Sequence, residues 1–183
     1  MIIIGLGSNL AGPWGTPRKT TVRALDTLRL KSIKIVVVSS LYTSKAYGRN
    51  GGADYVNAVA QVDTPLPPEA LIKRLQYVER LAERARGQRW GARTLDIDLL
   101  DWHGRICGPR LETGPTGGSE FRALSLPHPG ILTRPFVALP LAEIAPDWHH
   151  PVTGETATVL AQRLKRGREG KILARESFAQ LCT

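Results

Sequence analysis

The spacing of apolar residues in the first thirty positions predicts one strand followed by one helix. Residues 1–7 form a short apolar run that ends in glycine, which indicates a buried strand. Thr16 and Pro17 have the pattern of a helix start, with Thr16 as N-cap and proline at the first helical position. The helix is expected to bury one apolar face, formed by Val22, Leu25, Leu28 and Leu30.

The same order continues in the middle of the chain. Residues 33–42 are rich in β-branched side chains and residues 55–62 alternate, so they predict a second and a third strand. The proline-rich residues 64–69 begin a helix that extends to about residue 82, and residues 95–102 predict a fourth strand. This order indicates an α+β fold: a ferredoxin-like β-α-β-β-α-β core with an antiparallel sheet and helices mainly on one face.

The remaining sequence predicts fewer regular elements. A long loop of Gly, Pro and polar residues is inserted at about 103–122. Prolines punctuate residues 123–141, and we expect a short helical turn over 142–145 and a last helix over 156–164. We therefore interpret residues 1–164 as a single domain and residues 165–183 as a basic C-terminal tail. The basic residues up to 175 form either a solvated helix face or a flexible segment.

Composition limits the possible classes of protein. The chain has 183 residues, 42% of them hydrophobic, which suits one globular domain. Cys107 and Cys182 lie far apart and are interpreted as reduced thiols. The longest apolar runs fall far short of the roughly 20 residues that a membrane span needs, and no basic region precedes the first one. We expect a cytoplasmic protein, by default a monomer, without a membrane partner.

A net charge of +9 indicates an anionic partner, which could be nucleic acid, a nucleotide or a phosphorylated metabolite. Asp96 and Asp98 bear on this choice, because alternate residues of a strand share one face and their Cβ atoms would lie roughly 6–7 Å apart. Such carboxylates repel each other unless a cation lies near them, and Mg²⁺ is the natural candidate. The alternative is a solvated strand face, or carboxylates paired with arginines.

Four arginines precede this pair at positions 84, 86, 89 and 93. Phosphate groups would satisfy both sets, because arginines bind phosphate oxygens and aspartates hold the bridging metal. A salt-bridge network without a ligand stays open as the other interpretation.

The run Arg89-Trp-Gly-Ala-Arg-Thr-Leu-Asp-Ile-Asp-Leu-Leu100 closely resembles the signature of the 6-hydroxymethyl-7,8-dihydropterin pyrophosphokinase family. The resemblance covers roughly residues 2–160. The insertion at 103–122 has no counterpart in the family pattern, and Gly130 stands where an arginine is frequent. Further segments agree in order and spacing: Gly7-Ser-Asn-Leu10, Asp54-Tyr-Val-Asn-Ala58, Leu126-Pro-His-Pro129, Arg134-Pro-Phe136 and Pro140-Leu-Ala-Glu-Ile-Ala-Pro146.

The resemblance implies transfer of pyrophosphate from MgATP to the hydroxymethyl oxygen of the pterin, with release of AMP, in folate biosynthesis. Asp96 and Asp98 match the ligands of two Mg²⁺ ions, and Asp98 is also a candidate acceptor of the hydroxyl proton. Positioning and charge stabilisation supply most of the catalysis in such transfers. Arg84 and Arg93 match catalytic arginines that contact the phosphates, and Arg84 belongs to a segment that closes over the site.

The resemblance also assigns residues to the two substrates. Tyr55 and Phe136 match pterin-stacking positions, Asn57 matches the amide that reads the ring edge, and Gly48 would offer backbone groups. From the residues alone, Trp90, Tyr55 and Phe136 could equally be core aromatics, and His128 a surface histidine. The matched nucleotide-binding residues are Gln76, Trp90, Arg93, His128 and Arg134.

Two other classes of protein compete with this enzyme. An RNA-binding module is compatible with the fold and the charge, but it needs aromatic residues exposed on the sheet. Only 6% of the residues are aromatic, and paired strand carboxylates would repel a phosphate backbone. A non-catalytic relative is disfavoured because both aspartates, Asn57 and His128 are present. We therefore expect ATP and the pterin as partners, and no nucleic acid.

Overall fold

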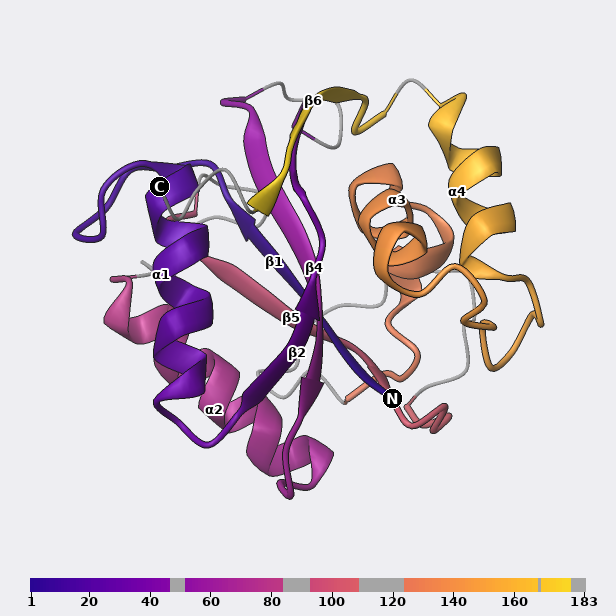
Figure 1. Cartoon of the computed structure of the whole chain (residues 1–183), viewed down its shortest axis with the longest axis horizontal. Coiled ribbons are helices and arrows are strands. Elements are labelled where there is room, and N and C mark those ends of the chain that lie inside the picture. Colours follow the sequence, from indigo (N-terminus) through magenta and orange to yellow (C-terminus); the bar gives the residue numbers. More distant parts are fainter. Residues whose placement is uncertain (47–51, 84–92, 109–123, 168, 179–183) are drawn as a thin grey trace.

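The computed structural model describes residues 1–46, 52–83, 93–108, 124–167 and 169–178 of the chain. Within these ranges, an antiparallel sheet lies between two layers of helices (Figure 1). The strands are β1 (Ile2–Ser8), β2 (Lys34–Val38), β3 (Leu41–Ser44), β4 (Tyr55–Asp63), β5 (Asp96–Trp102) and β6 (Ile172–Glu176). The helices are α1 (Pro17–Arg29), α2 (Pro68–Leu81), the 3-10 helix η1 (Pro129–Leu132), α3 (Pro135–Ile144) and α4 (Ala157–Lys165).

The strand order confirms the predicted α+β core. The sheet runs β5-β1-β4-β3-β6, and β2 also pairs with β4. The inner strand β1 pairs antiparallel with both β4 and β5. This arrangement is that of a ferredoxin-like β-α-β-β-α-β unit, in which β2 and β3 share the place of the second strand.

Helices α1 and α2 cover one face of the sheet. Thr16 is the N-cap of α1, and its side chain accepts a hydrogen bond from the Lys19 N–H at 3.4 Å. Leu25, Leu28 and Leu75 are fully buried against apolar residues of β1, β4 and β5. Leu30 does not join them, because α1 ends at Arg29 and leaves Leu30 83% exposed.

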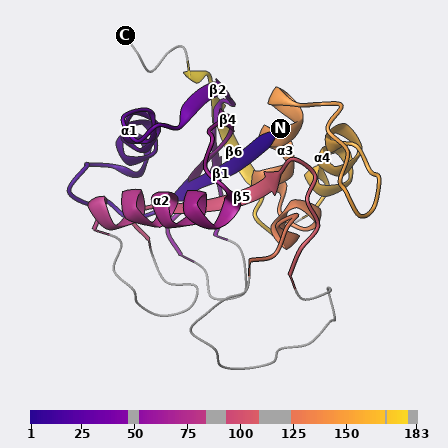
Figure 2. The same cartoon turned by 90° about the horizontal axis from the view of Figure 1, so that it is seen from below.

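The two helices of the β-α-β-β-α-β core lie on one face, as expected, and the additional helices α3 and α4 cover the opposite face (Figures 1 and 2). The expected helical turn at 142–145 is instead the end of a ten-residue helix, α3. Pro135 occupies its first turn, where a missing N–H costs nothing, whereas Pro140 lies inside it. Val137, Ala138 and Leu141 are buried against the sheet, and this packing outweighs the low helix propensity of proline.

The expected single strand over 33–42 is divided at Ser39 and Ser40, between β2 and β3. The Ser39 N–H donates to the Val59 carbonyl at 2.9 Å, and its hydroxyl oxygen accepts from the Val59 N–H at 3.0 Å. The Ser39 side chain thus takes the place of a backbone acceptor in the sheet, so the chain can bend here and the Val59 N–H is still paired.

The C-terminal segment differs from both expected forms, a helix face and a flexible tail. Residues 172–176 form strand β6, which pairs antiparallel with β3 from Leu41 to Ser44. The inserted loop lies largely outside the described residues, as does Cys182. In the portion of the chain that the structure describes, no helix is long and apolar enough to cross a membrane.

Candidate active site

Three neighbouring strands bring polar residues together at one end of the sheet. Gly7 on β1 pairs with Asn57 on β4 and with Asp96 on β5, and Gly5 pairs with Asp98. Ile97 and Leu99 belong to the core beneath α1 and α2. Because strand residues alternate, Asp96 and Asp98 share the other face, as the sequence predicted. Their side chains are 23% and 40% exposed.

Gly5 and Gly7 on β1 form the floor between the carboxylates and Asn57. A Cβ atom on Gly7 would lie 3.3 Å from Asn57 Oδ1 and 3.9 Å from Tyr55 Cδ1. On Gly5 it would lie 3.2 Å from Leu100 Cδ1. Sequence reasoning assigned these glycines no role. Their alternation within a strand is the signal that could have identified them, because strand glycines often mark a close approach.

Arg93 forms an ion pair with Asp96 across the first residues of β5. Its N–H donates to Asn9 Oδ1 at 2.7 Å, and its carbonyl accepts from the N–H groups of Asn9 and Leu10, both at 3.1 Å. Burial opposes the charged form of Arg93, yet the Asp96 carboxylate raises its pKa, with smaller contributions from Tyr55 and Asp98. The segment after β1 therefore fixes a guanidinium group beside the carboxylates.

The imidazole ring of His128 and the guanidinium group of Arg134 also lie near Asp98. Its Oδ2 lies 3.9 Å from His128 Nε2 and 4.0 Å from Arg134 Nη1. The His128 N–H donates to the Leu100 carbonyl at 2.8 Å, which ties this loop to β5. His128 Nδ1 accepts from the Gly130 N–H at 3.0 Å, so in the neutral ring the proton is on Nε2 and faces Asp98.

Gly130 allows His128 and Arg134 to lie this close together. A Cβ atom at Gly130 would be 2.9 Å from both His128 Nδ1 and Arg134 Cδ, too close without a shift. Arg134 is the N-cap residue of α3, and the Arg134 N–H donates to the Gly130 carbonyl at 2.9 Å. The structure thus brings Arg93, Asp96, Asp98, His128 and Arg134 together.

The Asn57 amide has a fixed orientation. Its Nδ2 donates to the Tyr42 carbonyl at 3.2 Å and to Ser44 Oγ at 3.0 Å, and Asn57 is only 4% exposed. Both amide hydrogens can therefore be used within the protein, which leaves Oδ1 beside Gly7 as an acceptor for a ligand. Sequence reasoning found Asn57 but not Ser44, because the partner follows from strand register.

The two proposed stacking residues lie at the border of the core. Tyr55 is half-buried at the start of β4, on the same face as Asn57. Phe136 is half-buried in the first turn of α3, with the Arg134 guanidinium carbon 6.0 Å from its ring centroid. Neither ring is fully enclosed, so each keeps a surface that a flat ligand could contact.

Not every assigned residue joins this group. Gln76 is exposed on α2, which packs on the other face of the sheet. Its assignment to the nucleotide stays a prediction. Gly48, Arg84 and Trp90 lie outside the described residues, together with Arg86 and Arg89.

The carboxylate pair fits a cation shared with phosphate. Among the described residues, no group of three or more His, Cys, Asp and Glu side chains could hold a metal ion alone. Mg²⁺ in phosphate-transferring sites is usually bound by only one or two carboxylates, with water and substrate phosphates completing its shell. Asp96 and Asp98 match that donor set.

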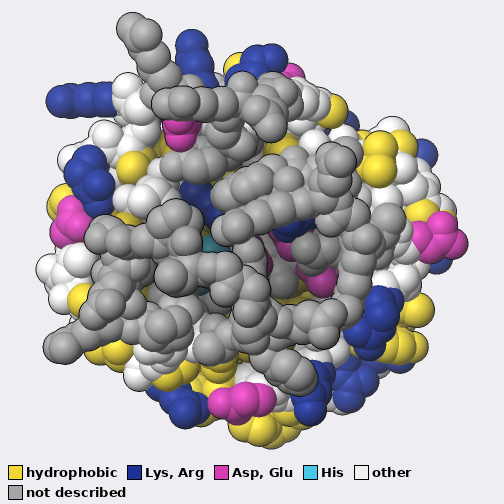
Figure 3. Space-filling view, turned by 180° about the vertical axis from the view of Figure 1, so that it is seen from behind, with side chains coloured by type: hydrophobic (Ala, Val, Ile, Leu, Met, Phe, Trp, Pro, Cys, Tyr) yellow, Lys and Arg dark blue, Asp and Glu magenta, His cyan; other side chains and the backbone are white. Residues whose placement is uncertain are grey.

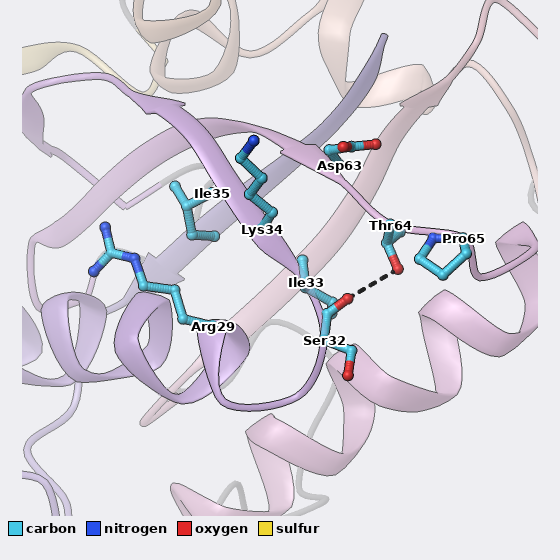
Figure 4. A pocket seen from close by; sticks show the side chains of 8 residues that line it. All are labelled: Arg29, Ser32, Ile33, Lys34, Ile35, Asp63, Thr64 and Pro65. Carbon is cyan, nitrogen blue, oxygen red and sulfur yellow. Dashed lines mark hydrogen bonds between the residues drawn. The ribbon is translucent and has the colours of Figure 1, made fainter.

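A hollow of about 510 Å³ lies at the far end of β4 from Asn57 (Figure 4). Within it, the Thr64 hydroxyl donates to the Ser32 carbonyl at 3.3 Å. It contains none of the assigned site residues. Its lining consists of Arg29, Ser32, Ile33, Lys34, Ile35, Asp63, Thr64 and Pro65.

The fold and the site together define a class of protein, a phosphate-group transferase built on a ferredoxin-like sheet. Comparison with known proteins makes this specific. The family model of 7,8-dihydro-6-hydroxymethylpterin-pyrophosphokinase (HPPK) matches residues 3–146, and the chain belongs to this family.

Individual relatives agree with the family match. The 2-amino-4-hydroxy-6-hydroxymethyldihydropteridine pyrophosphokinase of Haemophilus influenzae is 39% identical over 145 residues, which are 79% of this chain and 81% of that protein. The protein of the same name from Pseudomonas aeruginosa is 39% identical over 151 residues, 82% of this chain and 83% of that one.

A solved structure resembles the fold at low sequence identity. The HPPK-DHPS chain of Plasmodium falciparum superposes with a TM-score of 0.63 at 16% identity. The match covers 90% of this chain but 43% of the Plasmodium chain. This likeness supports the fold alone.

Proposed function

We propose that this chain transfers a pyrophosphoryl group from ATP to the hydroxymethyl oxygen of 6-hydroxymethyl-7,8-dihydropterin, releasing AMP, in folate biosynthesis. The observation that carries the proposal is the Asp96 and Asp98 pair on one face of β5, with Arg93, His128 and Arg134 around it. Family membership supplies the substrate class.

In this proposal the hydroxymethyl oxygen attacks the β-phosphorus of ATP. A new oxygen–phosphorus bond forms, the bond between Pβ and the α,β-bridging oxygen breaks, and AMP leaves with that oxygen. Asp98 is assigned as acceptor of the hydroxyl proton. Arg93 and Arg134 would contact the phosphates, where their charges offset the charge that develops during transfer.

Asp96 and Asp98 would hold Mg²⁺, two ions in the full proposal. Mg²⁺ bound there would neutralise charge on the phosphate oxygens and act as a Lewis acid. Before substrates bind, the ion pair with Arg93 and the nearby groups of His128 and Arg134 offset the repulsion between the carboxylates.

The Asn57 amide and the two half-buried rings support the assignment of the pterin. A pterin edge carries hydrogen-bond donors, and Asn57 Oδ1 is an acceptor held against the floor at Gly7. Tyr55 and Phe136 would stack on its faces. On the face in Figure 3, acidic side chains lie among lysines and arginines over the described residues. The absence of a nucleic-acid partner stays a prediction from the sequence. A cytoplasmic location and a monomeric state stay predictions from the sequence.

The test is AMP formation from MgATP with and without 6-hydroxymethyl-7,8-dihydropterin, with ADP measured in the same samples. We expect AMP to appear only with the pterin, in a one-to-one ratio with the pyrophosphorylated pterin. ADP formation without AMP, or AMP that does not depend on the pterin, would overturn the proposal.

A further inference from the structure

A polar cluster outside the site joins α3, β3 and β6. Glu143, near the end of α3, accepts four hydrogen bonds through its carboxylate. Its Oε1 accepts from the Ser40 N–H at 3.1 Å, from Ser40 Oγ at 2.8 Å and from Arg175 Nη2 at 2.8 Å. Its Oε2 accepts from the Tyr42 hydroxyl at 2.8 Å. Arg175 Nε also donates to Ser40 Oγ at 3.1 Å.

The cluster favours the charged form of the Glu143 carboxylate although the side chain is largely buried. The Glu143 side chain is 22% exposed, and although burial opposes its ionisation, the hydrogen bonds from Ser40, Tyr42 and Arg175 lower its pKa. Burial and the hydrogen bond to Glu143 in turn raise the pKa of Tyr42. An ionised carboxylate with this many donors fixes three elements in one arrangement.

Strand β3, which the cluster holds, is also the strand that orients Asn57. The Tyr42 carbonyl and Ser44 Oγ accept the two hydrogen bonds from Asn57 Nδ2. On the other side of β3, Tyr42 pairs with Arg175 and Ser44 pairs with Ile172 in the β6 ladder. A shift of β3 would therefore carry both acceptors of the Asn57 amide with it.

Helix α3 links the same cluster to Arg134, the residue assigned to the ATP phosphates. Arg134, at its start, lies 4.0 Å from Asp98 on β5, whereas Glu143 contacts β3. The helix thus crosses the sheet and carries Phe136 near one end and Glu143 near the other. Glu143 lies in the motif at 140–146 that resembles the family, but Arg175 lies beyond the family-matched residues 3–146.

We propose that Glu143 and Arg175 are positioning residues, which hold β3 and α3 so that Asn57 and Phe136 are set at the separation that binds the pterin. This inference rests on the proposed function. In this proposal Glu143 and Arg175 act through Asn57 and Phe136 and do not touch the substrate. Strand β6 is accordingly a part of the enzyme that determines affinity for the pterin, although it lies outside the family match.

Steady-state kinetics of Arg175→Ala and Glu143→Gln test the proposal. We expect the KM for the pterin to rise at least about fivefold in each, because small displacements of positioning groups weaken binding strongly. The KM for ATP and kcat should stay within about twofold of wild type, because the Gly130 carbonyl holds Arg134 at the other end of α3. Arg175→Lys keeps the charge and should recover part of the loss. Arg163→Ala is the matched control, since it removes an exposed arginine that pairs with Glu155.

A second measurement separates this inference from the proposed function. Hydrogen exchange of the Asn57 side-chain amide needs no substrate, and we expect it to accelerate at least about fivefold in Arg175→Ala but not in Arg163→Ala. An unchanged exchange rate, or a KM that rises equally for ATP and pterin, would overturn the positioning role. Wild-type protein without pterin-dependent AMP formation would overturn the proposed function instead, and the exchange result would still decide whether the cluster fixes Asn57.

Discussion

The two faces of the central sheet are built differently. The face under α1 and α2 is covered by a continuous apolar cluster that extends from Ile2 to Leu126, with residues such as Leu28 and Leu75 almost fully enclosed. The face under α3 and α4 has a smaller apolar cluster, and at one end of the sheet it gives way to Asn57, Asp96 and Asp98. One face supplies most of the hydrophobic stabilisation, whereas the other leaves room for charged groups and ligands.

The largest expected effect comes from substitutions at the polar end of the sheet, and it is on turnover. Asp96→Ala and Asp98→Ala should each reduce kcat about a hundredfold or more at saturating Mg²⁺, because each removes a ligand worth several kcal/mol in the transition state. Their melting temperatures should stay close to that of wild type. The measurement is AMP release together with thermal unfolding.

Asp101 is the matched control for these variants, because it lies on the same strand but is 1% exposed. Its carboxylate accepts from the Gly104 N–H at 3.1 Å and from Trp148 Nε1 at 3.2 Å. Asp101→Asn should lower the melting temperature and leave kcat near the wild-type value. Near-normal activity of either Asp96→Ala or Asp98→Ala would show that the metal assignment is wrong.

On the apolar face the expected effect is on stability. Leu28→Ala should lower the free energy of unfolding by about 2–5 kcal/mol, since Leu28 is fully buried and its truncation leaves a cavity. The kcat per folded molecule should not change. Urea denaturation and active-site titration measure the two quantities, and a large fall in kcat at unchanged stability would contradict this division of roles.

A smaller effect, on the KM for ATP, is expected at Gly130, which lies in close contact with His128 and Arg134. Gly130→Ala places a methyl group within 2.9 Å of His128 and Arg134 atoms, so one of these side chains must move. We expect the KM for ATP to rise by a factor of about three to ten, with a smaller change for the pterin. Gly154→Ala, at an open loop position, is the control for the added methyl group, and its backbone φ of 73° adds a small loss of stability. Equal KM values for Gly130→Ala and wild type would argue against ATP binding at His128 and Arg134.

The smallest effect is a pH dependence of stability in the α3–α4 layer. His150 is 2% exposed, and its Nδ1 accepts from the N–H groups of Val152 and Thr153. Burial lowers the pKa of His150. Above about pH 6.5 the ring is neutral in both states, but as the pH falls below that value the unfolded chain binds a proton first, so stability is lost.

His150→Asn keeps an acceptor in place but cannot titrate. The free energy of unfolding of this variant should therefore decline less between pH 7 and pH 5 than that of wild type. Urea unfolding curves at both pH values provide the measurement. Identical pH dependence in the two proteins would assign the titration to other groups.

Much of the fold and part of the site could be predicted from the sequence, for identifiable reasons. Periodicity placed Ile97 and Leu99 on one side and Asp96 and Asp98 on the other, because the side chains of a strand alternate. Helix α3 was missed because Pro140 reads as a helix breaker, and only tertiary packing of Val137 and Leu141 offsets its cost.

Other features depend on neighbours far apart in the sequence. The role of Gly7 follows from its register between Asn57 and Asp96, and the orientation of the Asn57 amide follows from Ser44. Strand β6 was not predicted, since its few apolar residues lie in a basic segment and its stability comes from pairing with β3. Local patterns do not contain that information.

The most direct test of the account is to map where substrates bind. Backbone amide shifts would be recorded as Mg²⁺, a non-hydrolysable ATP analogue and 6-hydroxymethyl-7,8-dihydropterin are added together. We predict that the largest shifts fall at Gly7, Asn57, Asp96, Asp98 and Arg134, with little change in α1. Shifts concentrated around the hollow at Lys34 and Asp63, with Asp96 and Asp98 unaffected, would contradict it.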